Sequence, residues 1–218
     1  MCNILVMDYR HICTAGMVAL HDLQTAHKLL EDGPESMNLR LVLIRHLILE
    51  IANIADLAAI SGRLYKNHPN LGELYKATRT DLDFFKYLRN IYVGHFTPDL
   101  TAKTFEWLPY TNAFLGSNKL NKQLGISWFA LETAINTYAA PETGHKIFPS
   151  DTDLNYPSDL TRFLNLLGET ALDSMSYATK LVAVTRSYVT IPDLDKELLG
   201  LAITAGQTDF EFLTKRRR

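Results

Sequence analysis

The sequence has only two cysteines, Cys2 and Cys13, among its 218 residues, and neither belongs to a CxxC pair. Two isolated cysteines cannot build a disulfide framework or a multi-cysteine metal site, and such scarcity is typical of proteins in a reducing compartment. A signal-peptide core is also lacking, because the short apolar run at residues 4–7 is followed at once by Asp8. These absences favour a cytoplasmic protein.

Long uninterrupted apolar runs are missing as well. The most apolar region, residues 39–60, is interrupted at Arg45, His46, Glu50, Asn53 and Asp56. A membrane-spanning helix would leave that many polar groups without partners. We therefore expect a soluble protein with no membrane partner, in which this region is a buried core helix.

The chain has no excess of charge of one sign. Its formal net charge is −2, and charged residues make up 21% of the sequence. A protein that binds nucleic acid without regard to sequence is normally more basic, so any RNA contact should be local. The basic run at residues 215–218 is predicted to be a solvated tail.

Sustained strand alternation, internal repeats and low-complexity segments are also absent, whereas helical periodicity runs through nearly the whole chain. Gly33-Pro34 should end the first helix, with glycine in the left-handed conformation, and Thr97-Pro98 should begin a later one. The sequence predicts helices at about 12–30, 36–64, 70–94, 97–109, 126–139 and 160–182, and a last helix after Pro192 with Leu194, Leu198, Leu201 and Ala202 facing inward. We expect an all-α bundle of about five to seven helices, forming a single domain over residues 1–218.

Between the fifth and sixth helices lies a proline-rich loop at about 140–157, which we expect to be functional or mobile. Two patterns that resemble metal-binding motifs occur there, and neither is complete. Glu142 and His145 have Glu-x-x-His spacing but no second copy, and the calcium-like start at Asp151 has Tyr156 where glycine is required. The sequence predicts no metal site and no cofactor.

The segment most suggestive of chemistry is Arg89-Asn90-Ile91-Tyr92-Val93-Gly94-His95. Arginine can hold a phosphate with two parallel hydrogen bonds, and histidine can exchange a proton near neutral pH. Six residues apart on a regular helix, Arg89 and His95 would point about 120° away from each other. A left-handed Gly94 would end the helix and let His95 turn towards Arg89. A helix end with a capping glycine and a nearby histidine explains the spacing equally well.

Other polar and aromatic residues are candidates to support this segment. Glu50, Asn53 and Asp56 lie on the predicted core helix, where they either contact Arg89 or His95, mark a subunit interface, or form a structural network. Tyr92, inside the segment, is a further candidate. The aromatic cluster that follows is expected mainly to pack in the core, with stacking on RNA bases as the alternative; it consists of Phe96, Phe105, Trp107, Tyr110 and Phe114.

An all-α chain with Leu88-Arg89-Asn90-Ile91-Tyr92-Val93-Gly94-His95 at a helix end resembles the HEPN superfamily. The motif of that family is an arginine, a polar residue that is often asparagine, and a histidine about four to six residues after the arginine; here it is six residues after. The similarity is most specific over residues 81–96, where it points to HEPN proteins of toxin–antitoxin and abortive-infection systems.

The resemblance implies a metal-independent endoribonuclease that works as a homodimer, with two motifs forming one composite site. His95 would then be a general acid or base, and Arg89 would hold the scissile phosphate. Asn90 would orient either His95 or the phosphate. It also implies an antitoxin partner in some members. A tyrosine that such an antitoxin modifies is replaced here by Thr97. A non-catalytic HEPN-like bundle that binds a nucleotide or a partner protein, and an unrelated helical interaction protein, are the alternatives.

Overall fold

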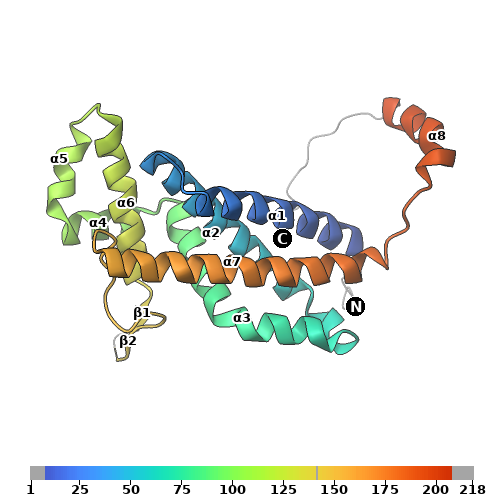
Figure 1. Ribbon diagram of the computed structural model, residues 1–218, viewed down its shortest axis with the longest axis horizontal. Helices are drawn as coiled ribbons and strands as arrows, with labels where there is room; N and C mark the ends of the chain where they lie inside the picture. The colour runs from blue at the N-terminus through green and yellow to red at the C-terminus, as the bar shows by residue number, and fades with distance from the viewer. Residues whose placement is uncertain (1–7, 141, 208–218) are drawn as a thin grey trace, which may run out of the picture.

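The computed structural model describes residues 8–140 and 142–207, which form an almost entirely helical molecule (Figure 1). In chain order the elements are α1 (Tyr9–Glu31), α2 (Met37–Ile60), the 3-10 helix η1 (Gly62–Lys66), α3 (Pro69–Leu88), the π-helical turn η2 (Arg89–Val93), α4 (Pro98–Trp107), the 3-10 helix η3 (Pro109–Thr111), α5 (Asn112–Leu115), α6 (Leu120–Asn136), β1 (Ala139–Ala140), β2 (Gly144–His145), α7 (Pro157–Arg186) and α8 (Leu194–Gly206). The strands pair antiparallel as one small hairpin. The predicted all-α class is confirmed.

Four long helices, α1, α2, α3 and α7, pack against one another and hold the core. Helix α2 is central, as its apolar sequence predicts, since Ile44, Leu47, Ile48 and Ile51 are fully buried. The short helices α4, α5 and α6 gather at one end of this bundle (Figure 1), where α6 contacts the η2 turn. The end of α3 therefore lies where the bundle meets the smaller helices.

Capping residues explain several helix boundaries. Gly33 has φ +74°, which confirms the predicted left-handed glycine after α1. Thr97 is the N-cap of α4, as predicted, because its hydroxyl accepts a hydrogen bond from the Leu100 N–H at 3.2 Å. Helix α2 ends earlier than expected, at Ile60, and the chain tightens into η1 instead of continuing as α-helix to residue 64.

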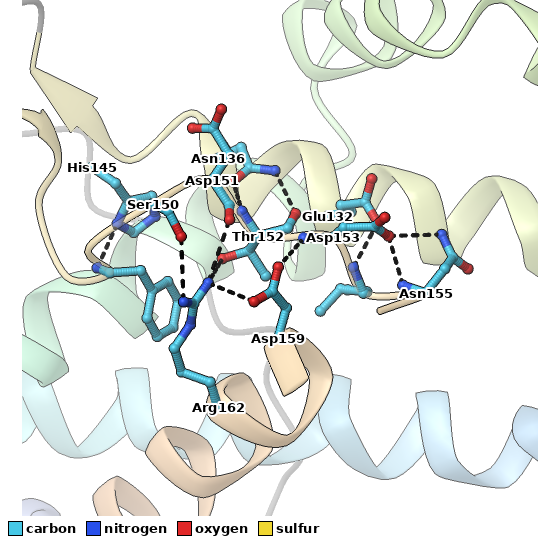
Figure 2. A network of polar contacts seen from close by, with 12 residues as sticks. Glu132, Asn136, His145, Ser150, Asp151, Thr152, Asp153, Asn155, Asp159 and Arg162 are labelled. Atoms are coloured by element: carbon cyan, nitrogen blue, oxygen red, sulfur yellow. Dashed lines mark hydrogen bonds and ion pairs between the residues drawn. The ribbon is translucent and has the colours of Figure 1, made fainter. Parts of the chain in front are cut away.

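The proline-rich loop, apart from residue 141, is tied to the helices on both sides of it (Figure 2). The Asn136 amide makes two hydrogen bonds of 2.8 Å with the backbone of Thr152, donating one and accepting the other. Glu132 accepts a hydrogen bond from the Leu154 N–H at 2.8 Å. From α7, the Arg162 guanidinium donates a hydrogen bond to the Thr152 hydroxyl at 3.3 Å. Side chains of α6 and α7 thus hold a segment that its composition marks as a loop.

His145 orders the same loop through its ring nitrogens. Its Nδ1 accepts hydrogen bonds from the N–H groups of Ile147 and Phe148, so its Nε2 carries the proton and donates to the Ile135 carbonyl at 2.9 Å. Burial lowers the pKa of His145 from its ordinary 6.5; the Ile135 hydrogen bond opposes this shift, and Arg162 adds to it. The neutral ring is therefore a structural part of the loop.

This arrangement makes loop stability depend on pH. Because the folded pKa of His145 lies below the unfolded one, its contribution is present above about pH 6.5 and is lost as the pH falls. We expect His145→Ala to cost about 2 kcal/mol near neutral pH, because two backbone N–H groups lose their acceptor. Urea unfolding at a series of pH values measures both effects. The variant should depend less steeply on pH than the parent, whereas His21→Ala, at an exposed position, should leave the curve unchanged.

Helix α8 departs from the sequence expectation. Leu198, Leu201 and Ala202, predicted to face inward, are exposed, and α8 lies away from the other helices (Figure 1). These residues have helical spacing, but the segment before α8 leads it away from the bundle, so no helix of the described part of the chain covers it. The basic run 215–218 and Cys2 lie outside the described residues. Among the described helices, none combines the length and apolar character needed to cross a membrane.

Candidate functional site

Arg89 begins the π-helical turn η2 and reaches back to helix α2. Its Nη2 donates to Asp56 Oδ2 at 2.8 Å, and the Lys86 ammonium pairs with the other oxygen of the same carboxylate. The Arg89 side chain is 22% exposed, and its Nε is buried with no hydrogen-bond partner among the described residues. One nitrogen of the guanidinium is thus tied to Asp56, and part of the Arg89 side chain remains accessible to solvent.

Gly94 does not adopt the left-handed conformation predicted for it. Its φ is −80° and its ψ is −35°, in the right-handed helical region. The helix widens instead, and the Gly94 N–H bonds to the Arg89 carbonyl, five residues back, at 2.8 Å. A Cβ at Gly94 would lie 3.2 Å from that oxygen and 3.6 Å from the Arg89 Cδ. Glycine therefore relieves crowding against the Arg89 carbonyl and is not required by an unusual φ.

Asn90 and His95 both lie on the surface beside this turn. Within the described part of the chain, neither side chain makes a hydrogen bond or an ion pair, and none joins Arg89 to His95. The expected swing of His95 onto Arg89 is thus not observed within one chain. Both side chains are free to meet a ligand or a second molecule.

The supporting candidates separate into three places. Asp56 contacts Arg89, as one alternative anticipated, whereas the Asn53 amide donates to Glu50 Oε2 at 3.1 Å, away from Arg89. Tyr92 is fully buried; its hydroxyl lies 2.8 Å from that of Ser127, and Arg45 stacks over its ring. Tyr92 therefore links α2, η2 and α6, and its position is that of a core residue.

A groove of about 430 Å³ runs between α1 and α2. Its polar lining includes His11 from α1 and Glu50, Asn53 and Asp56 from α2. Because Asp56 also pairs with Arg89, its carboxylate both lines the groove and contacts the segment from Arg89 to His95. This groove escaped the sequence analysis, since only the packing of α1 on α2 brings His11 beside the three polar residues.

Lys86 also escaped the sequence analysis, although a signal for it was present. It lies three residues before Arg89, a spacing that puts both cations on one helix face. Two cations on one face predict an acidic partner. The partner is Asp56, whose pKa would be raised by burial alone but is lowered overall by hydrogen bonds from Lys86 and Arg89 and by their charges.

Replacing Asp56 tests how much the ion pairs of Asp56 with Lys86 and Arg89 stabilise the fold. Asp56→Asn should lower the free energy of unfolding at neutral pH by about 1 kcal/mol or less, because Asp56 is 44% exposed and water screens the pairs. A lowered folded pKa means that the contribution is present above the unfolded value of 3.8 and disappears as the pH falls through the folded value. Denaturant titrations at neutral and strongly acidic pH should show the two proteins converging in acid. Asp83→Asn, which removes a looser 3.9 Å pair with Arg79, is the control and should have the smaller effect at neutral pH.

The aromatic cluster is less buried than predicted. Phe96, Trp107 and Tyr110 are 45%, 46% and 52% exposed, whereas Phe114 stacks on Phe129 of α6. These rings are half-exposed and not buried in the core, although Phe96 still contacts Tyr92 and Tyr110 contacts Phe129. Trp107 is the last residue of α4, Phe96 precedes that helix and Tyr110 lies in η3, so all three rings lie at or beyond helix ends.

The comparisons with models of known protein families, with curated proteins and with solved structures found no match for this chain.

Proposed function

We propose that this protein is a metal-independent endoribonuclease of the HEPN type, in which Arg89, Asn90 and His95 from two copies of the chain form one composite site. The observation that carries the proposal is the fixed orientation of Arg89. One guanidinium nitrogen is held by Asp56 at 2.8 Å, and the Arg89 side chain keeps 22% of its surface exposed; Asn90 and His95, from the same segment, are exposed and have no hydrogen-bond partner among the described residues. A preorganised cation and an imidazole with no partner in the described chain, brought together by a second copy, would suit chemistry on a phosphodiester.

The reaction needs two proton transfers. His95 as general base takes the proton of a ribose 2′-hydroxyl, and the 2′-oxygen attacks the adjacent phosphorus. The bond to the 5′-oxygen breaks, and this oxygen receives a proton from a general acid, the His95 of the second copy. The products are a 2′,3′-cyclic phosphate and a 5′-hydroxyl. Arg89 binds the non-bridging oxygens, where negative charge accumulates, and Asn90 orients the phosphate or the imidazole.

A composite site accounts for two features of the chain. The isolated chain joins Arg89 to His95 by no interaction within its described residues, whereas a two-fold interface brings two copies of the same helix end together. The net charge of −2 disfavours a broad basic groove, and pairing two motifs doubles the local positive charge. Phe96, exposed and next to His95, supplies a ring on which an unpaired base can stack.

The test is cleavage of single-stranded RNA by the purified protein in the presence of a metal chelator. The expected products carry 2′,3′-cyclic phosphate ends, which resist labelling by poly(A) polymerase until the phosphate is removed. Arg79→Ala is the matched control for loss of a cation at Arg89, because Arg79 is an exposed arginine on α3, the helix that leads into η2. Activity that disappears with the chelator, or that leaves other ends, contradicts the proposal.

A role as a toxin or phage-defence component, restrained by an antitoxin protein in the cytoplasm, extends this proposal. Thr97 caps α4 through its hydroxyl, so it replaces the tyrosine of some toxins with a structural residue.

The second candidate function is that of a non-catalytic bundle that binds a nucleotide or a partner protein. The Asp56 contact favours it, since part of the Arg89 charge is already neutralised. Binding of RNA without cleavage would support this candidate.

A further inference from the structure

Three side chains of the kinds that bind metals meet where α1 packs on α2. Asp22 comes from α1, and His46 and Glu50 lie one helical turn apart on α2. One ligand-type atom from each lies within 4.8 Å of the others, and His46 Nε2 is 3.9 Å from Asp22 Oδ2. The sequence could not reveal this group, because Asp22 is far from the other two along the chain.

Glu50 provides an independent indication that a cation belongs here. It is only 6% exposed, and its one hydrogen bond comes from the neutral Asn53 amide to Oε2. Its other oxygen accepts no hydrogen bond within the described part of the chain. A buried carboxylate is costly unless a positive charge compensates it.

The geometry needs only small adjustments to bind a metal. Bonds of about 2.0–2.1 Å in a tetrahedral site place ligand atoms roughly 3.3 Å apart. The observed separations exceed this by about 1.5 Å or less. Asp22 and His46 are 34% and 39% exposed, so they have room to change rotamer while the buried Glu50 stays in place. The same exposure leaves a path for an ion and a water ligand.

We propose that Asp22, His46 and Glu50 bind one divalent transition-metal cation of the Zn²⁺ class, with water completing the coordination. An imidazole ligand favours Zn²⁺ over Mg²⁺. Asn53 orients the Glu50 carboxylate through its hydrogen bond. The bound ion links α1 to α2 and takes no part in the chemistry at Arg89 and His95, so the site stands apart from the proposed ribonuclease activity.

Calorimetric titration of the chelator-treated, full-length protein with Zn²⁺ tests the site. We expect one Zn²⁺ per chain and an increase in Tm of about 5–10 °C at a hundredfold excess of Zn²⁺ over Kd. His46→Ala, Asp22→Asn and Glu50→Gln should each weaken binding at least about tenfold. Co²⁺ should give visible absorption bands in the parent that are lost in these variants.

The matched control is His21→Ala, which removes an exposed histidine next to Asp22 and should bind Zn²⁺ like the parent. Circular dichroism confirms that each variant remains folded. Absence of stoichiometric Zn²⁺ binding overturns the proposal, as does binding that persists in His46→Ala or competition by Mg²⁺ at equal concentration. Chelator-resistant RNA cleavage is measured separately, so the two proposals succeed or fail independently.

Discussion

His95→Ala should lower the rate of metal-free RNA cleavage by about a thousandfold, because general acid–base catalysis contributes about 10²–10⁴-fold to such reactions. Under the composite-site proposal each subunit supplies one imidazole, so a single substitution removes both the base and the acid. The measurement is the single-turnover rate on a labelled single-stranded RNA in the presence of chelator. His21→Ala, at an exposed position remote in sequence, should cleave at the parental rate.

Arg89→Ala should have an effect of similar size, since losing one preorganised donor to a developing oxyanion costs about 10²–10³-fold. Arg89→Lys should recover little activity, because an ammonium cannot both pair with Asp56 and hold two phosphate oxygens. Mixing the two inactive alanine variants tests the composite site directly. A hybrid dimer keeps one Arg89 and one His95 on different chains, so it lacks only the acid or only the base, and after subunit exchange it should cleave faster than the His95→Ala dimer, which lacks both. Parental cleavage by both alanine variants would refute this site.

The second large effect is expected at Tyr92. Tyr92→Ala should lower the free energy of unfolding by about 3–5 kcal/mol, because it empties a fully buried aromatic position between α2, η2 and α6. Tyr92→Phe should cost only about 1 kcal/mol, the loss of the hydrogen bond with Ser127. Chemical denaturation monitored by circular dichroism measures both. Tyr156→Ala, at a side chain 58% exposed, should change stability by about 0.5 kcal/mol or less.

The same pair of Tyr92 variants separates a structural role from a catalytic one. Burial raises the pKa of the Tyr92 phenol, so it stays protonated near neutral pH and cannot act as a base there. Tyr92→Phe should therefore retain near-parental RNA cleavage at a temperature where it is fully folded. A large loss of activity in folded Tyr92→Phe would assign the hydroxyl a part in the reaction.

The helical class and the central place of α2 could be predicted from the sequence because they follow from local rules. Apolar residues nearly all round one helix leave it no stable position except the core. The caps at Gly33 and Thr97 could be predicted equally well, since a left-handed glycine and a threonine N-cap act within a few residues. Helix α8 shows the limit of such patterns, because Leu198 and Leu201 have helical spacing yet remain exposed.

The candidate site could likewise be predicted only in part. The residue types and spacing of Arg89, Asn90 and His95 are visible in the sequence, whereas the conformation of the turn that carries them is not. The widened turn forms at Gly94, where its N–H reaches the Arg89 carbonyl at 2.8 Å, and η2 packs against α2, α3 and α6. Hydrogen-bond registers of this kind are decided by tertiary contacts, and a helical period of 3.6 residues does not anticipate them.

By itself, the sequence determined an all-α chain, its central helix, several of its caps and one segment suited to phosphate chemistry. Only the tertiary structure decided that Asp56 pairs with both Lys86 and Arg89, that Tyr92 belongs to the core, and that Asp22 meets His46 and Glu50. The physical reason is the distance along the sequence over which each kind of interaction acts. Helix formation and capping act over a few residues, whereas ion pairs and ligand clusters depend on which faces of distant helices come together.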